Sequence, residues 1–168
     1  MVISATTVKE LRERSGAGVI ECKNALEQAE GNVEQALDIL RQQGLAKAEK
    51  RSGRVAGQGL VEAYLHTGGR IGALVEVNCE TDFVGRTEDF KALAHDIAMQ
   101  VAATSPRYLS AEEMPESEQL DPKEVCLLQQ PFIKDPSKSI DDLVKEIAGR
   151  TGENVKISRF ARFELGGA

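Results

Sequence analysis

Residues 78–86 read Asn-Cys-Glu-Thr-Asp-Phe-Val-Gly-Arg, and the rest of the chain is arranged around this segment. Apolar residues alternate before it and recur at helical spacing after it, which predicts a corner between a strand and a helix. Asp82 and Phe83 would lie side by side on that corner. Pattern alone favours a Phe83 folded under the helix as core, because burial is worth about 1.5–3 kcal/mol. An exposed Phe83 would instead indicate a surface kept for a partner, and the remainder of the chain favours that second interpretation.

The residues before the corner predict an antiparallel hairpin. Period-two alternation runs from residue 57, and Thr-Gly-Gly-Arg at residues 67–70 supplies the turn, since paired glycines adopt positive φ. One face of the second strand is apolar throughout: Ile71, Ala73, Val75, Val77 and Cys79.

The residues after the corner predict a helix over 88–103 that Thr87 caps, a helix over 140–148 that Ser139 caps, and a third strand over 155–165. In the third strand Phe160 falls in one alternating set, and Ile157 and Phe163 fall in the other. One set would face the helices. The other would lie on an open sheet face, which predicts burial against a second copy of the chain.

Residues 1–44 predict three short helices that resemble a ubiquitin-associated (UBA-like) module, with Gly44 as the expected stop of the third. Residues 45–57 are basic and predict a helical tail that breaks at Gly53 into a linker, for which solvation is favoured over RNA contact. Residues 58–168 would form the core and dimerisation domain. The predicted class is α+β, with a three-stranded antiparallel sheet and helices packed on one face.

A second candidate surface lies in the N-terminal module, at Arg12, Val19 and Ile20. Neighbours on a helix point about 100° apart, so Val19 and Ile20 cannot lie equally deep. One of the two is expected in the small core, and the other beside Arg12 on a surface suited to a partner helix.

Composition excludes several classes of function. A net charge of −6 argues against direct nucleic-acid binding, and three widely spaced cysteines argue against a disulfide framework or a zinc site. No long apolar run predicts a membrane span, and a reducing cytoplasm fits best. No phosphate-binding loop, nucleophile elbow or metal motif is present, so no cofactor, metal or covalent catalysis is expected. His95 is expected on a solvated helix face.

Four ordered motifs carry a resemblance to one family. They are Lys-Glu-Leu-Arg at 9–12 with Ser-Gly-Ala-Gly at 15–18 and Cys-Lys-Asn-Ala-Leu at 22–26; Glu-Val-Asn-Cys-Glu-Thr-Asp-Phe-Val at 76–84; Gln-Pro-Phe-Ile-Lys-Asp at 130–135; and Arg-Phe-Ala-Arg-Phe-Glu at 159–164. Together they resemble bacterial elongation factor Ts over nearly the whole chain.

The resemblance implies a guanine-nucleotide exchange factor without covalent chemistry, whose partner is elongation factor Tu. It implies that the corner inserts near the partner's magnesium and nucleotide, and that the N-terminal module contacts the same domain. The residues that match these contacts are Arg12, Val19, Ile20, Thr81, Asp82, Phe83 and Val84.

The chain departs from longer family members, because it has no room for a second copy of the core or for a protruding helical hairpin. It looks like a short form, and a homodimer through the sheet face would supply the second half. Many members have two Met in place of Val19 and Ile20, and Ala in place of Gly85. The final strand has Ala161 and no Cys, so a dimer would form without a disulfide there. Two alternatives stay open: a UBA-like adaptor without exchange activity, and a thiol enzyme that uses Cys79.

Overall fold

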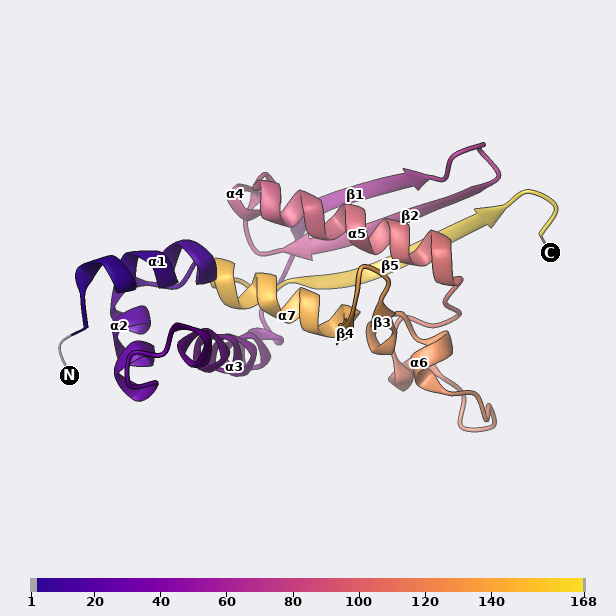
Figure 1. The fold of residues 1–168 in the computed structure, drawn as a ribbon. Helices are drawn as coiled ribbons and strands as arrows, with labels where there is room; N and C mark the ends of the chain where they lie inside the picture. Colours follow the sequence, from indigo (N-terminus) through magenta and orange to yellow (C-terminus); the bar gives the residue numbers. More distant parts are fainter. Residues whose placement is uncertain (1–2, 168) are drawn as a thin grey trace.

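Three helices come first in the chain and lie at one end of an elongated molecule (Figure 1). The computed structural model describes residues 3–167. Helix α1 spans Ala5–Ser15, α2 spans Val19–Gln28 and α3 spans Val33–Arg51. Ser4 caps α1 by accepting the Thr7 amide at 3.1 Å, and Gly16 ends α1 at φ +70°. The three helices share a small aliphatic core: Leu11, Cys22, Ala25, Leu26, Ala29, Ala36 and Leu40.

Helix α3 does not end at Gly44, so the predicted stop there is wrong. It continues to Arg51, and the helical tail predicted before the break at Gly53 is the last part of this helix. Ala48, in this extension, is buried in the main core, and the Gly44 backbone lies against Gly149. Glycine in a helix interior costs about 1 kcal/mol relative to alanine. Packing of α3 against the core outweighs this cost.

The predicted sheet is confirmed. Strands β1 (Gln58–Leu65) and β2 (Ile71–Cys79) form the hairpin, and β5 (Lys156–Glu164) pairs with β2, so the antiparallel order is β1-β2-β5. Gly68 and Gly69 both have positive φ in the turn. The fold is thus α+β, as the alternating pattern predicted.

A bulge in the β2–β5 pairing corrects the predicted faces of the third strand. Val77 pairs with Ile157, but the preceding Glu76 pairs with Arg159, so Ser158 is the extra residue. Ile157 and Phe160 consequently both pack toward the helices, while Phe163 is 71% exposed on the other face. A bulge shifts the alternation by one residue, which strict period-two counting cannot detect.

Helices α5 (Glu88–Thr104) and α7 (Ile140–Thr151) lie on one side of the sheet (Figure 1). Thr87 and Ser139 cap them, as predicted. Helix α7 passes through Gly149 and ends at Gly152, whose φ is +75°. Phe90 and Ile97 of α5 and Val144 of α7 join the inward face of β2 in the main core.

Between α5 and α7 the chain forms a lobe of short elements: η1 (Ala111–Glu113), α6 (Pro122–Val125), η2 (Leu127–Gln129), β3 (Pro131–Phe132) and β4 (Asp135–Ser139). The β3–β4 pair was not predicted. A buried Gln100 of α5 holds the lobe, because its amide donates to Pro131 O at 3.1 Å and accepts from Ile133 N at 2.9 Å.

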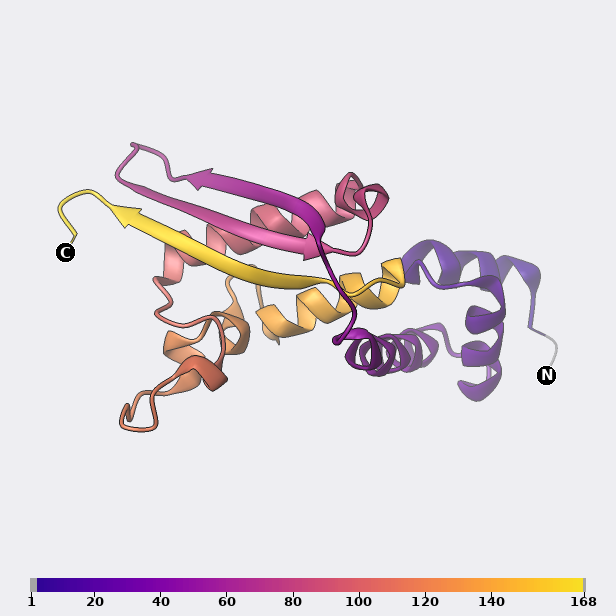
Figure 2. The ribbon, with the colours of Figure 1, turned by 180° about the vertical axis from the view of Figure 1, so that it is seen from behind.

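The opposite face of the sheet carries no helix in residues 3–167 (Figure 2). Its exposed apolar side chains gather toward the hairpin turn: Val61, Leu65, Leu74, Phe163 and Leu165. We call this set the open sheet face.

Candidate partner-binding surfaces

Phe83 lies on the surface, so the alternative in which it packs under α5 does not hold. The corner is a single helical turn, α4 (Asp82–Gly85), between the end of β2 and the start of α5. Phe83 is 78% exposed, while Val84 packs against the main core. Asp82 is half-exposed, and its carboxylate pairs with Arg86 at 2.9 Å. The ring and this carboxylate are neighbours on one projecting turn, which we call the corner surface.

The corner is held from several sides. Thr81 caps α4, and the Thr87 hydroxyl donates to Val84 O at 2.8 Å, which joins α4 to the cap of α5. The buried Cys79 thiol donates to Thr81 O at 3.1 Å. Gly59 of β1 has φ +134°, and a Cβ there would lie 2.0 Å from a backbone carbonyl oxygen. Only glycine fits at this position, beside the buried Gly85 of the corner.

A carboxylate from the far end of the chain also reaches the corner. Glu153, in the turn between α7 and β5, accepts from the amides of Glu80 and Thr81, each at 3.0 Å. Sequence reasoning missed Glu153, because no local pattern signals a contact across 72 residues.

The N-terminal surface consists of Arg12, Val19 and Ile20, all of which are exposed. Val19 is 55% and Ile20 75% exposed, so the expectation that one of them completes the core is wrong. Both lie in the first turn of α2, before its buried face begins at Cys22. The core of the module is closed by α1 and α3 against that later face, which leaves the first turn outside it.

The corner and N-terminal surfaces lie toward the same end of the molecule. Both views place α4 at the end of the sheet that is nearer the N-terminal helices (Figures 1 and 2). Arg150 links the two regions: its side chain lies against Gly16 at the end of α1 and pairs with Asp89 of α5 at 2.9 Å.

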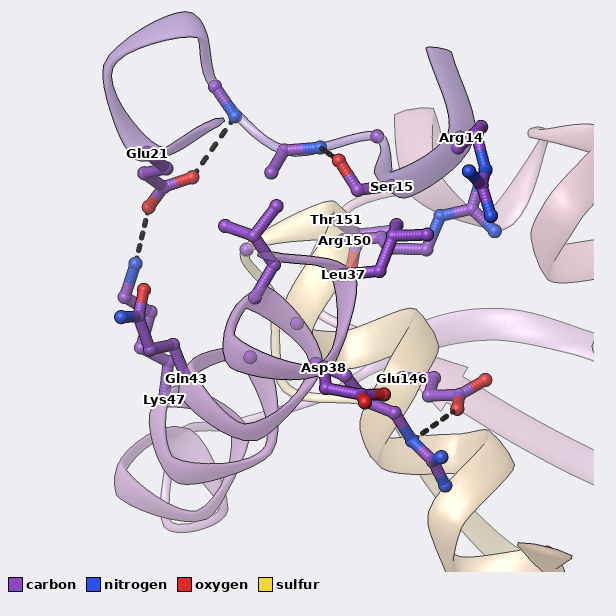
Figure 3. Close-up of a pocket in the computed structure, with 18 of the residues that line it drawn as sticks. Arg14, Ser15, Glu21, Leu37, Asp38, Gln43, Lys47, Glu146, Arg150 and Thr151 are labelled. Carbon is purple, nitrogen blue, oxygen red and sulfur yellow. Dashed lines mark hydrogen bonds and ion pairs between the residues drawn. The ribbon is translucent and has the colours of Figure 1, made fainter. Parts of the chain in front are cut away.

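A cleft of about 500 Å³ separates the N-terminal helices from α7 (Figure 3). Ion pairs line it, including Arg41 with Glu146 at 3.1 Å and Lys47 with Glu21. These charges are matched within the chain. The cleft therefore lies where the N-terminal module meets the core, and ion pairs are its main polar feature.

The titratable groups offer little for catalysis. All three cysteines are buried free thiols, and burial, with the nearby Glu153 charge, raises the pKa of Cys79 above its usual value. A thiol nucleophile needs the opposite shift. His95 is exposed, with Nδ1 3.2 Å from a Glu62 carboxylate oxygen. Within residues 3–167, no group of three or more His, Cys, Asp or Glu side chains is placed to hold a metal ion.

No helix in the described part of the chain is both long and apolar enough to cross a membrane.

Comparison with known proteins gives one consistent family. The family model described as "Elongation factor TS" matches residues 5–123 and 118–167. The chain belongs to the elongation factor Ts family. Curated relatives with that name include proteins of Carboxydothermus hydrogenoformans (49% identical), Caldanaerobacter subterraneus subsp. tengcongensis (48%) and Syntrophomonas wolfei subsp. wolfei (50%). The alignments cover 98% of this chain and 90%, 98% and 91% of the respective relatives. As a member of this family, the chain is a translation elongation factor.

The elongation factor Ts alignments also show a difference in length between this chain and its relatives. Each spans 195 positions, more than the 168 residues of this chain, so part of each relative has no counterpart here. The two family matches overlap at residues 118–123, which cover the end of the loop after η1 and the first two residues of α6. A short loop there fits the prediction of a short form, and the corner lies outside it.

Proposed function

We propose that this elongation factor Ts relative releases GDP from elongation factor Tu by inserting the corner surface beside the partner's magnesium and nucleotide. The observation that carries the proposal is the 78% exposed ring of Phe83 on a turn fixed between a buried strand and a buried helix. A wedge needs rigid apolar bulk and no reactive group, which matches the chemistry of the site. The Asp82 carboxylate would compete for the hydrogen-bond donors that hold the phosphate.

The magnitudes are compatible with this role. Accelerating release about 10⁴-fold requires lowering its barrier by about 5.5 kcal/mol. Burying the Phe83 ring on the partner supplies roughly 1.5–3 kcal/mol, and weakened contacts to magnesium would supply the rest. Thermodynamic linkage adds a condition, since a factor that weakens GDP binding must itself bind less tightly in the presence of GDP.

The N-terminal surface is the proposed second contact. Arg12 supplies an exposed cation, and Val19 and Ile20 supply two exposed aliphatic side chains. A helix of the partner's nucleotide domain would pack there, while the corner reaches the nucleotide. Residues Thr81 and Val84 would frame the inserted ring, and the reaction would take place in the cytoplasm.

We also propose that two copies pair through the open sheet face. Phe163 sits opposite Gly72 in the β2–β5 register, and Leu74 opposite Ala161, so small residues flank two exposed large ones. Burial of these side chains against a second sheet would remove them from water. Light scattering should give twice the chain mass, and Phe163→Glu should give the monomer mass. A wild-type monomer would contradict the pairing.

The exchange proposal is tested by release of a fluorescent GDP from elongation factor Tu. The wild-type chain should accelerate release, and Phe83→Ala should lower the acceleration by about 10–100-fold, the equivalent of the lost burial. Ile133→Ala is the matched control, since Ile133 is an exposed apolar residue of the β3–β4 lobe. Binding of elongation factor Tu without any faster release would favour the adaptor alternative.

A further inference from the structure

The turn between α7 and β5 makes a three-bond clamp on the corner. One carboxylate oxygen of Glu153 accepts from Glu80 N and Thr81 N, each at 3.0 Å. The other oxygen accepts from the Thr81 hydroxyl at 2.5 Å. These donors come after the last paired residue of β2, Cys79, so the strand ladder does not bond them.

The neighbouring Asn154 extends the clamp to the linker between the modules. Its backbone amide donates to the Glu80 carboxylate at 2.6 Å. Its side chain is 5% exposed and donates to Ser52 O at 3.1 Å and to Arg54 O at 2.7 Å. The corner, the end of α3 and the end of α7 therefore meet at two consecutive residues of one turn.

We propose that Glu153 is a positioning residue that fixes the angle at which Phe83 is presented to the partner. The inference rests on the proposed exchange function. Thr81 is the cap of α4, so a carboxylate that holds both its amide and its hydroxyl sets the direction in which α4 leaves the sheet. A corner fixed in advance loses less entropy when it docks.

Three substitutions distinguish the effect of the side-chain length of Glu153 from the effect of its charge. Glu153→Ala removes the whole clamp. Glu153→Asp keeps the charge but is one methylene too short to meet all three donors. Glu153→Gln keeps the length and an acceptor oxygen for the two amides, while its amino group can donate to the Thr81 hydroxyl oxygen. Positioning therefore predicts that the Gln variant is close to wild type and that the Asp variant resembles the Ala variant.

Two readouts are measured on each full-length variant. The first is amide hydrogen exchange of Glu80 and Thr81, which should speed up by about tenfold or more in the Ala and Asp variants when the clamp opens. The second is GDP release from elongation factor Tu, which should be about tenfold less stimulated by the same two variants. In a Phe83→Ala background, Glu153→Ala should cause no further loss, because a positioning residue acts through the ring it positions.

Asp142→Ala is the matched control. The Asp142 carboxylate likewise accepts from an amide and a hydroxyl, both of Ser139, at 2.9 and 3.0 Å at the start of α7. Its loss should lower stability while leaving the corner amides protected and GDP release unchanged. Thermal unfolding of each variant separates a general loss of stability from a local effect on the corner.

Several outcomes would overturn the inference. One is full activity of Glu153→Asp with loss in Glu153→Gln, which would mean that the charge itself meets the partner. Another is additive loss in the double variant, and a third is unchanged amide exchange in Glu153→Ala. A wild-type chain that leaves GDP release unchanged would overturn the proposed function instead, and the amide exchange of residues 80 and 81 would still decide whether the clamp exists.

Discussion

The contact between Gly44 of α3 and Gly149 of α7 allows a prediction in which the same substitution has different effects on stability at two facing positions. A Cβ added at Gly149 would lie 3.0 Å from Gly44 Cα and 3.1 Å from its carbonyl carbon and oxygen. These are backbone atoms and cannot rotate away, so the helices would have to separate. A Cβ added at Gly44 would meet only Gly149 Cα, at 3.8 Å, which is an ordinary contact.

Gly44 lies in the interior of α3 and Gly149 in the last turn of α7, so Ala gains up to about 1 kcal/mol of helix propensity at each. Overpacking at Gly149 costs about 1–3 kcal/mol. We therefore expect Gly44→Ala to stabilise the chain by about 1 kcal/mol. Gly149→Ala should be neutral or destabilising by up to about 2 kcal/mol. Much of the propensity cancels in the comparison, so the difference of about 1–3 kcal/mol reports mainly the steric cost.

The assay is urea unfolding of both variants and wild type, supported by thermal unfolding. For a chain of this length, 1 kcal/mol corresponds to a Tm shift of about 2–4 °C. Equal shifts in the same direction for both variants would refute the reasoning, because the close approach of α3 and α7 at this crossing would then have no cost. Gly149→Ala should also weaken exchange, since α3 packs between α7 and the helices α1 and α2, which carry the N-terminal surface.

Three further predictions concern single positions. Gly85→Ala should stabilise by about 0.4–1 kcal/mol, because the new Cβ meets Cys79 Sγ at an ordinary 3.5 Å; a lower urea midpoint would contradict this. Gly59→Ala should destabilise strongly, since its Cβ would lie 2.0 Å from Val77 O at φ +134°, and a wild-type Tm would count against the geometry. Burial raises the pKa of Cys79 and of Cys126 above the usual value of a thiol. The unfolded chain therefore loses these thiol protons at a lower pH than the folded chain does. The free energy of unfolding should consequently fall as pH rises above about 9. A series of urea denaturations that shows no decline above that pH would contradict this prediction.

Much of the fold was predictable because its signals are local. Thr87 and Ser139 mark helix starts, and the paired Gly68 and Gly69 mark the hairpin turn. Alternation and helical spacing place the corner between a buried strand and a buried helix. The exposure of Phe83 was the open question, and local pattern alone pointed to the core.

The incorrect predictions share a physical cause: packing between segments that are distant in the sequence overrides local preference. Helix α3 crosses Gly44 because its later turns pack on α7. The bulge at Ser158 depends on the partner strand. Val19 and Ile20 both remain exposed because the module closes its core with a later part of α2.

The order and type of the main elements, the family motifs and the place of the corner in the chain all follow from local sequence. Those features depend on backbone preferences and side-chain periods within a few residues. The outward position of Phe83 and the hydrogen bonds from Glu80 and Thr81 to Glu153 became visible only in the folded chain. The clamp joins residues 72 positions apart, and such a contact exists only once α7 and β5 have packed beside β2.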